Sequence, residues 1–195
     1  MQKKIYENYT KENRKVIMRV NIIHPIPVSF LDYPDKESLC LSVYMMGCSN
    51  NCIRCHNKEF QDYDYDVGTA LLGPLDLFYV LKDASERNFN TKKVCLLGGD
   101  PLSGNNVFFT IEFLKINEVM WGRYFDICLY TGCTYTEVPE IIKQRCEFIK
   151  TGKYSHKNRL KPEKTNKYIQ FGSSNQKLYN KNGSILTEKG RYYFD

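Results

Sequence analysis

The chain has 195 residues, about the size of one domain, and 42% of them are hydrophobic, enough for a substantial core. The sequence indicates neither a signal peptide nor an apolar run of about 18 residues that could cross a membrane, so we expect a cytoplasmic protein. The formal net charge is +6, but the middle of the chain is acidic and residues 143–167 are strongly basic.

Hydrophobic patterning predicts strands that alternate with helices. Residues 38–46 form an apolar run that leads into a cysteine-rich loop, and residues 74–87 have helical spacing behind Pro74, a favoured first residue of a helix. The other predicted elements are a strand at 92–99, a helix at 105–120, a strand at 125–132, a helix at 134–144 and a strand at 146–152. Strands joined by such helices pair in parallel, so the sequence predicts an α/β fold.

Four glycine-containing motifs each follow a predicted strand. They are the cysteine loop, LLGGDPL at 96–102, YTGC at 130–133 and IKTGKY at 149–154. Glycines after strands also make ordinary tight turns, so one such motif alone says little. Because parallel α/β folds bind ligands where their strands end, the four motifs together predict one binding rim.

The cysteine loop contains Cys48, Cys52 and Cys55 with the spacing C-x3-C-x2-C. Cysteines in a chain without a secretion signal are expected to be thiols rather than disulfides. Three thiolates can bind a [4Fe-4S] cluster and leave its fourth iron open, whereas four ligands would close the cluster for electron transfer. The spacing therefore favours chemistry at an open iron.

A structural zinc site is the main alternative, with His56 or a distant cysteine as fourth ligand. Such sites usually combine two closely spaced pairs, and the remaining cysteines form no such pair, which favours the cluster. Three of these cysteines fall in predicted strands and are expected to be small buried side chains: Cys40, Cys95 and Cys128. For Cys133 and Cys146 both packing and an auxiliary redox role are open, and packing is favoured.

The basic run KTGKYSHKNRLKPEKTNK, at 150–167, has the charge that nucleic acid attracts. It has few aromatic side chains on which bases could stack. We therefore expect a solvated or partner-facing loop and no binding of nucleic acid.

Together these motifs resemble a known family. GCSNNCIRCHN is similar to the signature of the radical S-adenosylmethionine (SAM) superfamily, and LLGGDPL, YTG, FIKTGKY and FGSSNQ follow it as in the activating proteins of anaerobic ribonucleoside-triphosphate reductases. The resemblance covers about residues 17–180. It implies a partial (β/α) barrel of the radical SAM type with mostly parallel strands, in a domain of residues 17–195 behind an N-terminal extension of residues 1–16.

The resemblance also implies a function. In that family a [4Fe-4S] cluster takes an electron from a low-potential donor such as flavodoxin or ferredoxin and cleaves SAM. The resulting 5'-deoxyadenosyl radical removes a hydrogen atom from a glycine of the large subunit of an anaerobic (class III) ribonucleotide reductase. Because the cofactors supply this chemistry, no catalytic acid or base is expected among the side chains.

Site residues follow from the same resemblance. The cluster ligands would be Cys48, Cys52 and Cys55, and the positions that match SAM-binding positions are Gly98, Gly99, Asp100, Pro101, Thr131, Gly132, Lys153, Ser173, Ser174 and Asn175. The glycine turn would contact the methionine ammonium, where any side chain would intrude on SAM. Thr131 and Gly132 would lie under the ribose or adenine, Lys153 would lie near SAM, and the GSSNQ segment would close the site.

Four positions depart from the family pattern. Arg54 stands where an aromatic residue or glycine is usual, and is expected in solvent rather than stacked on adenine. Thr151 replaces an aspartate and Phe171 an arginine, which removes two expected charges. His56, where a tyrosine is common, is expected to support the site or face solvent rather than bind metal.

Other functions remain open on the sequence alone. The chain could activate a different glycyl-radical enzyme or act directly on a small molecule, although it is short for an enzyme that must enclose its own substrate. A zinc or iron–sulfur module that binds nucleic acid is a further alternative. Visible absorbance separates zinc from an iron–sulfur cluster, because Zn²⁺ is colourless.

Overall fold

The computed structural model describes residues 19–35, 39–161 and 168–193. The predicted extension at 1–16 therefore lies outside the described residues. The predicted start of the domain, at residue 17, lies outside them as well. No helix in the described part of the chain is both long enough and apolar enough to cross a membrane.

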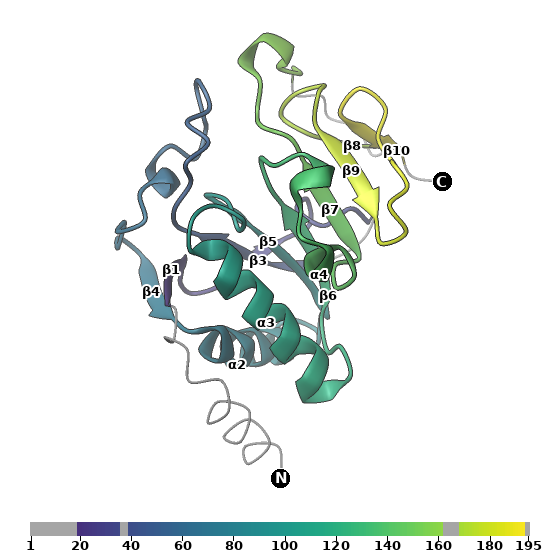
Figure 1. Ribbon diagram of the computed structural model, residues 1–195. Helices are drawn as coiled ribbons and strands as arrows, with labels where there is room; N and C mark the ends of the chain where they lie inside the picture. The colour runs from purple at the N-terminus through teal and green to yellow at the C-terminus, as the bar shows by residue number, and fades with distance from the viewer. Residues whose placement is uncertain (1–18, 36–38, 162–167, 194–195) are drawn as a thin grey trace.

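Four parallel strands form the centre of the main sheet, in the order β3 (Cys40–Met45), β5 (Lys93–Gly98), β6 (Asp126–Tyr130) and β7 (Phe148–Thr151). These are the four strands that the apolar runs predict. Parallel pairing brings all four carboxyl-terminal ends to one edge of the sheet, where the cysteine loop and the segment after β7 project together (Figure 1). The prediction of an α/β fold with a parallel sheet is confirmed.

Antiparallel strands that the sequence analysis did not find complete the sheet. β1 (Val20–Ile23) lies between β3 and β4 (Thr69–Leu72), β2 (Val28–Ser29) pairs with β3, and β9 (Lys177–Asn180) pairs with β7. The path from β4 to β9 does not close on itself. A separate two-stranded sheet is formed by β8 (Tyr168–Gln170) and β10 (Arg191–Tyr193).

Two long helices cover one face of the sheet (Figure 1). α2 (Pro74–Arg87) begins with proline, and Asp76 accepts a hydrogen bond from the backbone N–H of Gly73 at 3.0 Å, which satisfies one of the free N–H groups at the helix start. α3 (Asn106–Trp121) ends at Gly122, whose φ of +60° is the left-handed conformation that terminates many helices.

The helix predicted at 134–144 is wrong as a single element. The structure has a 3-10 turn, η2 (Tyr135–Glu137), and then a four-residue helix, α4 (Glu140–Lys143). Pro139 separates them, because its ring disfavours helical backbone in the preceding residue, and Val138 is extended with ψ of 126°. Two further 3-10 turns lie in loops, η1 (Glu59–Gln61) and η3 (His156–Asn158).

The parallel strands are buried on both faces, and alternate residues point to opposite sides. One side packs on the helices in the main core, which includes Leu41, Val43, Leu96, Ile127 and Leu129. The other side carries a second apolar cluster with Cys40, Cys95 and Cys128, closed by Tyr33 from the β2–β3 connection. At the carboxyl-terminal end of this second face lie Tyr44, Leu97, Tyr130 and Lys150.

Leu96→Ala should lower the free energy of unfolding by about 2–5 kcal/mol, because Leu96 is 1% exposed and its removal leaves a cavity. Leu71→Ala is the matched control. Leu71 is 54% exposed on β4, so this substitution should lower the free energy of unfolding only slightly. Urea denaturation of both variants measures the difference. Equal losses would contradict the assignment of the core face.

Candidate functional site

The cysteine loop follows β3 and turns sharply at Gly47, which has φ of +96°. The backbone N–H groups of Gly47 and Cys48 donate to the carbonyls of Phe60 and Gln61, at 2.9 and 3.1 Å. A Cβ atom on Gly47 would lie 2.1 Å from a ring carbon of Tyr63. Backbone hydrogen bonds and this ring therefore fix where the loop starts.

The glycine turn after β5 packs directly against the cysteine loop. Gly99 donates to the carbonyl of Met45 at 2.8 Å, and the next backbone N–H, that of Asp100, donates to the carbonyl of Gly47 at 3.0 Å. A Cβ atom on Gly99 would lie 2.5 Å from the Gly47 oxygen and 2.6 Å from the Phe60 oxygen. The close approach of the cysteine loop therefore requires glycine at position 99, and the contact of this turn with SAM stays a prediction.

The Asp100 carboxylate joins three loops at this edge. Its Oδ2 accepts hydrogen bonds from Asn50 Nδ2 at 2.6 Å and from the backbone N–H of Gly132 at 2.8 Å, and its Oδ1 accepts from the N–H of Leu102 at 2.9 Å. Asp100 is 2% exposed. The cysteine loop, the turn after β5 and the turn after β6 are thus held to one buried charge.

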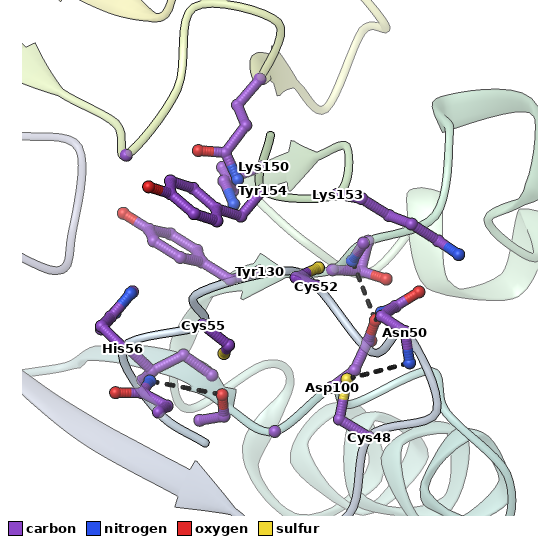
Figure 2. A pocket seen from close by; sticks show the side chains of 18 of the residues that line it. Cys48, Asn50, Cys52, Cys55, His56, Asp100, Tyr130, Lys150, Lys153 and Tyr154 are labelled. Atoms are coloured by element: carbon purple, nitrogen blue, oxygen red, sulfur yellow. Dashed lines mark hydrogen bonds between the residues drawn. The ribbon is translucent and has the colours of Figure 1, made fainter. Parts of the chain in front are cut away.

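A cavity of about 420 Å³ opens between these loops, within the range of small-molecule sites. Cys48, Cys52 and Cys55 line it, and their sulfur atoms face the central space from three sides (Figure 2). Burial raises the pKa of the Cys48 thiol, an effect opposed by the N–H of Asn50, which lies 3.5 Å from its sulfur. Among the described residues, no three His, Cys, Asp or Glu side chains form a site for a single metal ion.

Six of the ten predicted SAM-binding residues line the same cavity: Gly98, Gly99, Asp100, Thr131, Gly132 and Lys153. Gly132 packs closely under the Asn50 amide, since a Cβ atom there would lie 2.3 Å from Asn50 Nδ2. Lys153 is exposed, and its side chain extends away from the cysteines (Figure 2). The structure therefore brings the cysteine loop, the glycine turn and the YTG segment together.

The other four predicted residues are not in the cavity wall: Pro101, Ser173, Ser174 and Asn175. Ser173 is fully buried, and its hydroxyl accepts a hydrogen bond from the N–H of Ser155 at 3.2 Å. Asn175 Nδ2 donates to the carbonyl of Lys153 at 2.9 Å. This segment therefore supports the loop after β7, while its neighbours Gly172 and Gln176 line the cavity.

The structure shows the contacts and burial of the four residues that depart from the family pattern. Arg54 has φ of +57° and is exposed, and its Nη1 lies 3.0 Å from His156 Nε2 on the loop after β7. His56 is exposed but borders the cavity. Phe171 packs edge-on against Tyr130, with ring centroids 5.9 Å apart, and Thr151 is buried beside β9.

Lys150 is a cavity residue that the sequence analysis missed. The predicted strand at 146–152 includes Lys150, and the structure places this residue on β7 with its side chain partly buried in the cavity wall. Burial lowers the pKa of Lys150 to about 8, although the Asp100 carboxylate and the Cys52 thiol favour its charged form. The signal for this placement was the two-residue period of the strand, which puts Lys150 on the same face as Phe148.

The remaining cysteines serve mostly in packing. Cys40, Cys95 and Cys128 are fully buried in the second apolar cluster, and burial is the main cause of their raised pKa values. Cys146 is fully buried in the main core. Cys133 is partly buried and is not among the residues that line the cavity.

Comparisons with known proteins found a matching family and similar proteins. The family described as a 4Fe-4S single cluster domain matches residues 37–179. The chain is similar to the anaerobic ribonucleoside-triphosphate reductase-activating protein of Pasteurella multocida (strain Pm70), at 24% identity over 115 residues, which are 58% of this chain and 70% of the relative. It is also similar to the crystal structure of QueE from Escherichia coli, at 13% identity and a TM-score of 0.42, over 67% of this chain and 69% of that one.

The donor set fits a [4Fe-4S] cluster. A cluster of four irons needs its thiolates spread around it rather than gathered on one ion, and the three thiols surround a shared space in this way (Figure 2). The cavity also extends beyond the cysteines to Lys150 and Phe171, which leaves room for a second ligand.

Replacing Cys48, Cys52 or Cys55 with alanine should remove most of the iron from anaerobically reconstituted protein, because each would supply one of three thiolates. Cys95→Ala is the control, since that thiol is buried in a packed cluster away from the cavity. Iron analysis and visible absorbance measure the difference. Full iron content in the triple variant would refute the ligand assignment.

Asp100→Asn should lower the free energy of unfolding by about 2–3 kcal/mol, because an amide N–H₂ then faces groups that donate to the carboxylate. Iron content should fall as well, since the cysteine loop loses its anchor. Asp126→Asn, at an exposed position on β6, is the control. Unchanged stability and iron content would show that the carboxylate does not hold the loops.

Stability should depend on the charge of Lys150. Between pH 8 and 10.5 the unfolded chain retains a proton that the folded chain loses, because the folded pKa is lowered from 10.5 to about 8. The free energy of unfolding of wild type should therefore rise across this range relative to Lys150→Met. Urea titrations at several pH values measure the difference, and parallel curves would contradict the buried placement of Lys150.

Proposed function

Because this chain belongs to the family of 4Fe-4S single cluster domains, we propose that it is a radical SAM activating enzyme. In this proposal Cys48, Cys52 and Cys55 hold the [4Fe-4S] cluster and SAM occupies the adjoining part of the cavity. Its substrate is a glycine in the large subunit of an anaerobic ribonucleoside-triphosphate reductase. The name of the Pasteurella multocida relative supports this choice of substrate.

The observation that carries the proposal is a cavity lined by three cysteines that continues well beyond them. Three thiolates satisfy three irons, so the fourth can accept another ligand. When bound, the cluster supplies the electron that cleaves SAM. Electron transfer alone would need neither an open iron nor the additional space.

The chain's own residues contribute geometry and exclusion of water. Asp100 fixes the cysteine loop against the turns after β5 and β6, so the thiols are held before any ligand enters. The backbone at Gly98 and Gly99 and the wall residues Thr131, Gly132 and Lys153 are proposed to contact SAM. Pro101, Ser173, Ser174 and Asn175 are proposed to support these contacts from behind the wall.

The partner and the electron source follow from the same proposal. The reductase subunit would cover the open side of the cavity, and a low-potential donor such as flavodoxin or ferredoxin would supply the electron. The cytoplasmic location remains a prediction from the sequence.

The decisive experiment mixes the reduced, reconstituted protein with SAM and a cognate anaerobic reductase. A glycyl radical should form on the reductase and appear as a doublet in its electron paramagnetic resonance spectrum. Cys52→Ala should give no radical, and Cys95→Ala should retain it.

Two other outcomes would contradict the proposed function. SAM cleavage without a glycyl radical on a proven cognate reductase would refute this substrate. A reconstituted protein with iron but no SAM cleavage would refute the radical SAM reaction itself.

A further inference from the structure

Two lysine side chains line the cavity, and their surroundings differ. Lys153 is exposed, and its side chain extends away from the cysteines (Figure 2). Lys150 lies on β7, and its side chain is partly buried in the cavity wall. Lys150 therefore brings a positive charge into the cavity that water screens less, and this residue is not among the proposed contacts of SAM.

Two aromatic rings lie next to the Lys150 ammonium. Its Nζ is 5.4 Å from the centre of the Tyr130 ring and 6.0 Å from that of Phe171. Within the described ranges of the chain, Lys150 forms no ion pair with a carboxylate. Ring faces attract a cation only weakly, so they offset a small part of the cost of burying this charge.

The charge on Lys150 persists at neutral pH. Burial lowers its pKa to about 8, which leaves the ammonium as the main form at a pH of about 7. The Asp100 carboxylate and Cys52 both favour this charged form. Asp100 already accepts three hydrogen bonds from the surrounding loops. Cys52 has no such commitment, and its sulfur becomes a thiolate when it binds iron.

A cluster held by three thiolates is an anion beside this ammonium. The thiolates outweigh the positive charge of the oxidised core, and the electron gained on reduction adds further negative charge. A fixed positive charge nearby therefore favours the reduced form, and net charge and solvent exposure both set the potential of such clusters. The effect is strong where water is excluded, and the rings of Tyr130 and Phe171 provide such a wall.

We propose that Lys150 raises the reduction potential of the [4Fe-4S] cluster, so that the cluster accepts an electron from its low-potential donor more readily. Lys150 acts through its charge and is not a ligand of the cluster. One electron passes from the donor to the cluster, and the ammonium keeps its proton throughout. This inference rests on the proposed function, because it requires Cys48, Cys52 and Cys55 to hold the cluster.

The midpoint potential of the reconstituted protein, measured without SAM, tests the proposal. Redox titration followed by electron paramagnetic resonance of the reduced cluster gives this potential. Lys150→Met removes the charge and keeps an unbranched side chain. It should lower the equilibrium constant for one-electron reduction about tenfold, which is a potential about 59 mV more negative. The iron content and visible absorbance of the oxidised variant should match those of wild type.

Three variants separate the charge of Lys150 from its size, its polarity and the net charge of the protein. Lys150→Arg keeps the charge and should have a potential close to that of wild type. Lys150→Gln is polar but neutral and should behave as Lys150→Met does. Lys177→Met removes an exposed lysine that pairs with Thr151 and so points to the opposite face of the sheet. Its potential should be unchanged, because water and salt screen that charge.

The outcomes distinguish this inference from the proposed function. If wild type forms the glycyl radical but Lys150→Met and Lys150→Gln keep the wild-type potential, the role of Lys150 is wrong and the proposed function stands. An equal shift in Lys177→Met, or no recovery in Lys150→Arg, would also overturn that role. The predicted shift without a glycyl radical on the cognate reductase would support the role of Lys150 and refute the substrate. A reconstituted wild type without a [4Fe-4S] cluster would overturn both.

Discussion

The Asp100 carboxylate accepts hydrogen bonds from Asn50, Leu102 and Gly132, and the cavity depends on that arrangement. Each donor belongs to a different loop at the carboxyl-terminal edge of the sheet, so the position of one loop determines the positions of the others. A buried carboxyl group is costly unless it is hydrogen-bonded, and these three hydrogen bonds offset that cost. The thiols are therefore placed by an interaction that involves none of them.

The second constraint is that each parallel strand places side chains on both faces of the sheet. On β5, Leu96 packs in the core beneath the helices while Leu97 lines the cavity, and on β6, Leu129 and Tyr130 divide in the same way. A shift of one residue in register would exchange these roles on a whole strand. Stable packing on the helix side therefore also fixes which side chains face the ligands.

The sequence predicted the parallel strands, the two long helices and the rim where the motifs meet, because long apolar runs and glycines after strands are local signals. It did not predict the antiparallel strands, which are short and depend on pairing with distant partners. Within the site, the roles of Asn50 and Lys150 were not predicted, for the same reason. Their roles come from contacts such as that between Asn50 and Asp100, which no local pattern records.

The cavity wall combines residues that lie far apart in the sequence. Its cysteines lie near residue 50, whereas Lys150, Phe171 and Gln176 complete the far side. During synthesis the thiols leave the ribosome before that far side exists, because domains emerge from the N-terminus first. Until the far side has been synthesised, the three thiols are exposed to solvent. Assembly of the cluster is therefore best timed after translation, when the last third of the chain has folded over the loop and can shield it from oxygen.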